Sequence, residues 1–222
     1  MFNEDRKKIR LLGTDAISNA KYNGILGLVV LYGLFMNIIL CVFFGRQSVQ
    51  MMTNSPHLLL LIYFILCIAG SVIANKSDNP WISFLGYNMI VLPIGIIVSG
   101  VVGTTYLPLV LNAVKMTFAI TIVIIVLSCL FPDFFLSLGK ALFISLLALI
   151  AVSILFVFLR ISSIWVAYFG AGIFTLYIGY DIQKAQQYPK TVDNAVDCAI
   201  DIYLDIINLF LRILEIMSKN KK

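Results

Sequence analysis

The sequence contains little charge. Only 12% of its 222 residues are Asp, Glu, Lys or Arg, whereas 61% are hydrophobic. One soluble core of this size cannot bury so much apolar surface, so the composition excludes a soluble globular domain. The sequence instead predicts an all-α membrane protein that crosses the bilayer several times, with the lipid bilayer as its first partner.

Histidine and closely spaced cysteines are scarce as well. The one histidine, His57, excludes a Ser–His–Asp triad and a histidine metal cluster. The four cysteines lie in apolar stretches and form no Cys-x-x-Cys pair, which favours buried hydrophobic roles. A glycine-rich phosphate-binding loop is also missing from the sequence. We therefore expect no enzyme activity, no cofactor and no certain metal ligand.

The basic residues show how the chain is oriented. A net charge of +5 could suggest nucleic-acid binding, but Lys and Arg gather at the termini and in short gaps between apolar runs. That distribution is typical of membrane topology and argues against a nucleic-acid partner. The N-terminal segment is the richest in basic residues, which predicts a cytoplasmic N-terminus.

Seven apolar runs are each about long enough to span a bilayer. They lie near residues 23–44, 57–74, 81–102, 108–131, 136–159, 163–182 and 194–217. The predicted domains are a cytoplasmic segment 1–22, a transmembrane domain 23–217 and a tail 218–222. Glycines that favour close helix packing occur in the first, third and sixth runs: Gly24, Gly27, Gly33, Gly95, Gly100, Gly103, Gly170, Gly172 and Gly179.

The side of the membrane that holds the tail is left open by the sequence. Seven crossings would place the tail outside, where its lysines at 219, 221 and 222 break the rule that positive charge stays inside. Either that charge bias is overridden, or the last run does not fully cross.

The last run, "DIYLDIINLFLRILEI", has a stripe of polar residues. Asp201, Asp205, Asn208, Arg212 and Glu215 recur at intervals of three and four residues, so they share one helix face. An acid in a spanning helix must face protein or water. The stripe predicts a helix that is surrounded by other helices and has one face on a polar cavity. The alternative is an amphipathic helix lying at the membrane surface.

Three further acids lie close to this run. Asp193 and Asp197 precede the stripe, and we interpret them as a solvated helix start. Asp181 ends the sixth run, and by position alone it is also a solvated helix end. If Asp181 meets Asp205 across two antiparallel helices, the two carboxylates would share a proton near physiological pH.

The segments "FTLYIGYD" and "IYLDIINLFLRIL" resemble the signature of the Bax inhibitor-1 family, also called the transmembrane Bax inhibitor motif or YccA-like family. The resemblance implies a seven-helix bundle with the last helix central and with Asp181 and Asp205 as paired aspartates. In bacterial relatives this pair is described as a pH sensor that regulates a calcium leak. Some relatives latch a basic residue of the second helix onto the first of these aspartates, and Lys76 is the candidate here. The relatives use Arg, so a Lys latch would be weaker.

Asp201 departs from the family pattern, which has an uncharged residue four positions before the core aspartate. A carboxylate one turn from Asp205 adds negative charge on nearly the same face. We hypothesise that Asp201 enlarges a site that attracts cations, because calcium takes oxygen ligands.

The sequence and the resemblance together favour a pH-sensitive calcium leak channel, a monomer in the bacterial plasma membrane. Calcium is then the transported ion and the proton is the gating ligand. Two alternatives stay open. One is a regulatory protein that binds other membrane proteins, such as proteases or cell-death proteins. The other is an intramembrane aspartyl protease, although the chain has "YLD" where such a protease needs a GxGD-type sequence.

Overall fold

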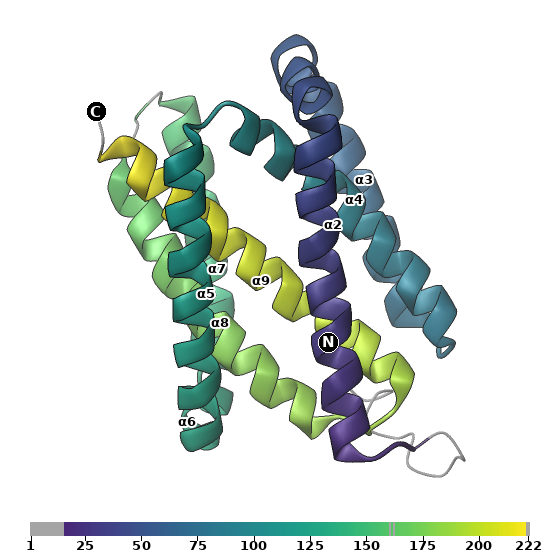
Figure 1. Ribbon diagram of the computed structural model, residues 1–222. Coiled ribbons are helices and arrows are strands. Elements are labelled where there is room, and N and C mark those ends of the chain that lie inside the picture. The colour runs from purple at the N-terminus through teal and green to yellow at the C-terminus, as the bar shows by residue number, and fades with distance from the viewer. Residues whose placement is uncertain (1–15, 160, 162, 221–222) are drawn as a thin grey trace. The chain divides into compact units, whose positions relative to one another are not determined.

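The protein is helical throughout the part of the chain that the structure describes. This computed structural model describes residues 16–159, 161 and 163–220, which form eight helices and no strand (Figure 1). The helices are α2 (Asn19–Asn54), α3 (Pro56–Lys76), α4 (Pro80–Gly103), α5 (Leu107–Leu130), α6 (Pro132–Ser137), α7 (Gly139–Phe158), α8 (Ile164–Gln187) and α9 (Val192–Lys219).

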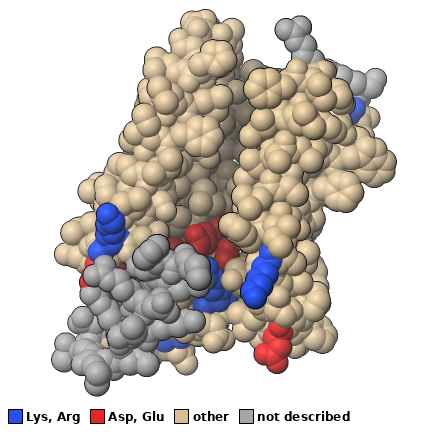
Figure 2. Space-filling model, turned by 180° about the vertical axis from the view of Figure 1, so that it is seen from behind, with Lys and Arg blue, Asp and Glu red and all other residues tan. Residues whose placement is uncertain are grey.

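Five of these helices are long and apolar enough to cross a membrane. They are α2, α3, α4, α5 and the segment Gly139–Phe156 of α7. Figure 2 shows few Lys, Arg, Asp or Glu side chains on the face drawn. The protein is therefore an integral membrane protein. Helices α8 and α9 are long enough but carry more charged residues, so they are not apolar enough to be counted with these five. That they cross the membrane stays a prediction.

The predicted outer segments overlap the ends of this helical region. The first helix begins at Asn19, inside the predicted N-terminal segment 1–22, of which residues 1–15 lie outside the described residues. The last helix continues to Lys219, so it includes the first residues of the predicted tail. Residues 221 and 222 of that tail also lie outside the described part.

The chain divides into two compact units. The first contains the residues up to Thr105 together with Ala185–Tyr203, and the second contains Tyr106–Lys184 together with the residues from Leu204 onward. Helices α8 and α9 each contribute residues to both units.

Helices α2, α3 and α4 pack closely in the first unit, and glycines permit this. An added Cβ at Gly70 or at Gly86 would lie 2.5 Å from the carbonyl oxygen of the other glycine, so α3 and α4 touch backbone to backbone. Gly33 leaves space for the rings of Tyr87 and Tyr203. The packing role predicted for glycines is wrong for Gly24, Gly27 and Gly172, because an added Cβ at any of the three would meet nothing within 4 Å.

Helix α2 is longer than predicted. The first two predicted runs, 23–44 and 57–74, are separated by residues 45–56, but the helix runs on through most of this gap to Asn54. The reason is packing that the local sequence does not reveal, since Gly100 and Gly103 of α4 leave space for Met52 and Val49 of α2. A 36-residue helix is about 54 Å long, more than the hydrocarbon core of a bilayer.

The second unit contains α5, α6, α7, most of α8 and the end of α9. The predicted fifth run at 136–159 is divided, because the short helix α6 ends at Ser137 and α7 begins at Gly139. Gly179 of α8 leaves space for the ring of Phe135 in α6. The Gln183 amide donates to the Ser128 hydroxyl of α5 at 3.3 Å, and both side chains are buried.

Helix α9 differs from the apolar helices in how it is buried. Exposed large hydrophobic side chains occur along α2, α3, α5 and α7, but beyond Phe169 the described chain has none. Helix α9 thus presents no strongly exposed apolar face. This argues against the amphipathic surface helix, which would need such a face.

Candidate functional site

The two aspartates of the predicted pair lie in the second unit and are both buried. Asp181 belongs to α8 and is 9% exposed, and Asp205 belongs to α9 and is 7% exposed. The interpretation of Asp181 as a solvated helix end is therefore wrong. Burial of a carboxylate is costly unless other groups compensate it, so the surroundings of these two side chains decide what they can do.

Tyr177 links the two aspartates. Its hydroxyl interacts electrostatically with both Asp181 and Asp205. Tyr177 lies one helical turn before Asp181 on α8, so both side chains project from one face. Both carboxylates therefore lie near enough to Tyr177 to act on it electrostatically, and we name Tyr177, Asp181 and Asp205 the carboxylate site.

A lysine accompanies the carboxylate site. Lys184 interacts electrostatically with Tyr177, and its ammonium lies 5.7 Å from the centroid of the Tyr180 ring. The Tyr180 ring packs edge-on against Tyr177, with centroids 6.4 Å apart, and Gly139 of α7 leaves space for it. Sequence reasoning missed Tyr177 and Lys184 as members of this site. The available signal was their spacing from Asp181, four residues before and three after, which places them on its helix face.

The other predicted site residues lie in the first unit. Lys76 is the last residue of α3 and is exposed. Asp201 is exposed, whereas Asp205, one turn later, is buried. Tyr203, two residues before Asp205, exchanges hydrogen bonds through its hydroxyl with Asn37 of α2. Among the described residues, no group of three or more His, Cys, Asp or Glu side chains could hold a metal ion.

The acids at the start of α9 are buried, so the interpretation of a solvated helix start is wrong. Asp193 is 9% exposed and Asp197 is 5% exposed. The Ser83 hydroxyl of α4 donates to the Asp193 carboxylate at 2.7 Å. This contact fastens the first turn of α9 to α4 within the first unit.

The turn between α8 and α9 is held by Lys190. Its ammonium donates to the Gln186 carbonyl at 2.9 Å, near the end of α8, and lies 4.4 Å from the centroid of the Tyr22 ring. Burial lowers the pKa of this lysine. The Gln186 side chain also donates to Asn23 at 3.0 Å, so the turn lies at the beginning of α2.

Known proteins resemble this chain over different lengths. A family described as "Inhibitor of apoptosis-promoting Bax1" matches residues 20–222. Uncharacterised proteins from two strains of Helicobacter pylori are 36% identical to it over 84 residues, and one from Campylobacter jejuni is 35% identical over 81 residues.

These matches cover 37% and 36% of this chain, respectively. They span about a third of the relatives' own length, 36% and 34%. The family match, in contrast, extends from the first turn of α2 to the end of α9. Together with the five apolar helices, it shows that this integral membrane protein belongs to the Bax inhibitor-1 family.

Proposed function

We propose that the protein is a cation leak channel, permeable to calcium, that responds to pH through Asp181 and Asp205. One observation carries the proposal. Two carboxylates from different helices are buried within electrostatic range of the same tyrosine, Tyr177, inside a membrane protein. A structural role alone would be served as well by uncharged residues, which cost less to insert.

Protonation would act on this site through charge. When both carboxylates are ionised they repel each other, and one added proton turns repulsion into a shared hydrogen bond. The two aspartates come from α8 and α9, so this change biases how these helices pack. Pairs of this kind titrate as a unit, so the response belongs to the pair.

Lys184 supports the same mechanism. It is a cation that interacts with the carboxylate site from within α8, so it offsets part of the negative charge when the aspartates are ionised. The proposed latch, Lys76, remains a further candidate for the same task. Neutralising each lysine in turn would tell which one matters for the pH response.

A seven-helix bundle with α9 at its centre is part of this proposal, and contacts at the end of α8 support it. Five crossings by α2, α3, α4, α5 and α7 carry the chain from the side where α2 begins to the other side, where α8 begins. The turn after α8 contacts the beginning of α2 through Gln186 and Lys190. Helix α8, about 36 Å long, would thus connect the two sides.

Helix α9 would make the return crossing. Its first turn contacts the beginning of α4 through Asp193 and Ser83, and its last residue, Lys219, donates to the Ser163 carbonyl just before α8 at 3.4 Å. The two chain ends would then lie on opposite sides, with the N-terminus in the cytoplasm of a bacterial cell. Lys219 pairs with Glu215 at 2.7 Å, which reduces the excess positive charge on the outer side.

Calcium flux into proteoliposomes tests the proposal. We expect flux that changes between about pH 5 and pH 8 in the wild type and that becomes insensitive to pH when both aspartates are replaced by Asn. Absence of flux at every pH would contradict the channel and favour the regulatory protein that acts by binding membrane partners. Hydrolysis of a membrane peptide that requires both aspartates would favour the protease.

A further inference from the structure

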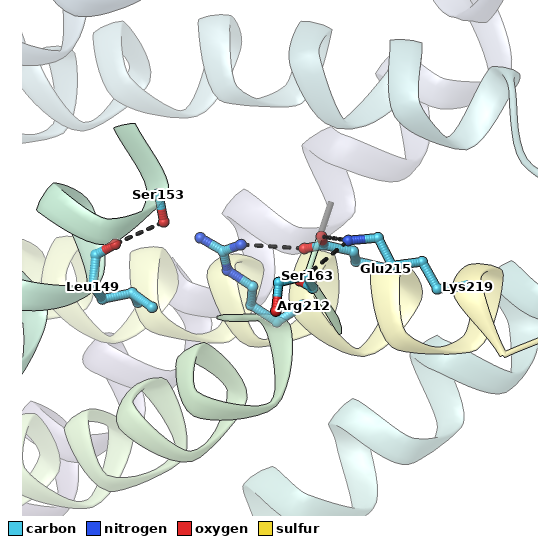
Figure 3. A network of polar contacts seen from close by, with 6 residues as sticks. All are labelled: Leu149, Ser153, Ser163, Arg212, Glu215 and Lys219. Carbon is cyan, nitrogen blue, oxygen red and sulfur yellow. Dashed lines mark hydrogen bonds and ion pairs between the residues drawn. The ribbon is translucent and has the colours of Figure 1, made fainter. Parts of the chain in front are cut away.

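Three charged side chains form a connected cluster near the end of α9. The Arg212 guanidinium lies 3.1 Å from one Glu215 carboxylate oxygen, and the Lys219 ammonium lies 2.7 Å from the other (Figure 3). The side chains of Arg212, Glu215 and Lys219 are 27%, 34% and 31% exposed, respectively. We name these three residues the charged triad. It has two cations and one carboxylate, so its net charge is +1.

The charged triad continues the face of α9 that carries Asp205. From Asp205 the polar positions follow at Asn208, Arg212, Glu215 and Lys219, in steps of three and four residues. At 1.5 Å per residue, Arg212 lies about 10 Å beyond Asp205 along the helix axis. Arg212, Glu215 and Lys219 are partly exposed, as are their apolar neighbours Leu211, Ile216 and Met217, so the charged side chains make up part of the accessible surface at this end of the helix. Partly exposed charges in the last two turns of a helix that crosses the membrane must face water or polar partners, so the proposed pathway would be hydrated along this face.

Helix α8 accommodates the arginine. An added Cβ at Gly170 would lie 2.9 Å from the Arg212 Nε and 3.1 Å from its Cδ, so the glycine leaves space for the arginine side chain. A simple stabilising ion pair is the plainest alternative for such a cluster. Partly exposed ion pairs of this kind contribute little stability, however. A stabilising pair would also need only one cation for the Glu215 carboxylate, whereas this cluster has two.

We infer that the charged triad is an electrostatic barrier to cations at this end of the pathway, and that its net charge sets the leak rate. This inference rests on the proposed channel. A cation that moves along the polar face of α9 must pass two positive charges and one negative charge. Removing one positive charge lowers that barrier, and removing the negative charge raises it.

The test uses a series of nearly isosteric variants that change the net charge. Arg212→Gln and Lys219→Gln each lower the net charge of the triad to zero, and Glu215→Gln raises it to +2. The double variant Arg212→Gln with Glu215→Gln has the wild-type net charge of +1. We expect the variants with a net charge of zero to show calcium flux about threefold to tenfold above wild type. The variant with a net charge of +2 should show flux below wild type by a similar factor. The double variant should resemble wild type.

Two controls separate charge from structural damage. Lys219→Arg keeps the charge and should leave the flux unchanged. The differences within the series should also shrink at about 1 M salt, where charges are screened beyond about 3 Å. Lys219→Gln leaves the Arg212–Glu215 pair intact, so it keeps the test valid if the arginine variant fails to fold.

The outcomes distinguish this inference from the proposed channel. If Arg212→Gln and Glu215→Gln shift the flux in the same direction, the triad is only a structural ion pair. If pH-dependent flux is present but does not follow the net charge, this inference alone is overturned. If the wild type conducts no cations at any pH, both this inference and the proposed channel are overturned.

Discussion

Tyr203 of α9 and Asn37 of α2 exchange hydrogen bonds inside the first unit. The Asn37 amide approaches the Tyr203 hydroxyl at 3.0 Å, and the hydroxyl approaches the amide oxygen at 3.2 Å. Tyr203 is fully buried and Asn37 is 4% exposed. Polar contacts between helices in a membrane stabilise packing and also select one register, because a shifted helix leaves both groups unsatisfied. The contact therefore fixes the register of α9 against α2 at Tyr203, two residues before Asp205.

This contact predicts a measurable coupling. Tyr203→Phe should lower the free energy of unfolding by about 1–3 kcal/mol, because it leaves the Asn37 amide buried without its partner. Adding Asn37→Leu should cost less than the sum of the single changes, since the double variant has no unsatisfied group. Unfolding in mixed micelles would measure this double-mutant cycle. Strictly additive effects would show that the hydrogen bond contributes nothing.

The contact between α3 and α4 predicts that two glycines respond differently to alanine. Gly86→Ala places a Cβ 2.5 Å from the Gly70 carbonyl oxygen, so it should cost about 1–3 kcal/mol of unfolding free energy. Gly24→Ala is the matched control in α2, because its Cβ meets nothing within 4 Å and a helical alanine is favoured over glycine. Equal thermal stability of the two variants would refute the backbone contact.

Asp201 predicts a charge effect that is separate from gating. Because Asp201 is exposed one turn before Asp205, Asp201→Asn should reduce calcium flux at low ionic strength by lowering the local cation concentration. The midpoint of the pH response should stay the same, since Asp181 and Asp205 are unchanged. Asp201→Glu is the matched control, as it keeps the charge. An unchanged flux in Asp201→Asn would remove this role.

The proposed seven crossings predict where reporters are active. Alkaline phosphatase, which folds only outside the cytoplasm, should be active when it is fused after residue 222 and inactive when it is fused after Lys76. The prediction follows from the contacts at the two ends of α8 and α9. Equal activity at both positions would mean that one of these helices does not cross.

The sequence predicts the helices well because long apolar runs report lipid exposure directly. Each of the seven predicted runs overlaps one long helix. The errors occur where tertiary contacts decide, as in the extension of α2, which depends on glycines of α4 far along the chain. Burial of Asp193 was missed for the same reason, since its partner Ser83 belongs to another helix.

The carboxylate site was only partly predictable. Family resemblance identified Asp181 and Asp205, whereas periodicity alone identified only the stripe of α9. Tyr177 and Lys184 were missed because a tyrosine and a lysine near a helix end are common and carry no distinctive pattern. Their spacing along α8 places them beside Asp181. Their proximity to Asp205 depends on how α8 and α9 pack, which a sequence pattern does not specify.

The most direct test of the central claim is the pH dependence of calcium flux in proteoliposomes that contain the wild type, Asp181→Asn with Asp205→Asn, or Asp201→Asn as a control for surface charge. The account predicts a pH response in the wild type and in Asp201→Asn that is lost in the doubly neutralised protein. A pH response that persists without Asp181 and Asp205 would contradict it.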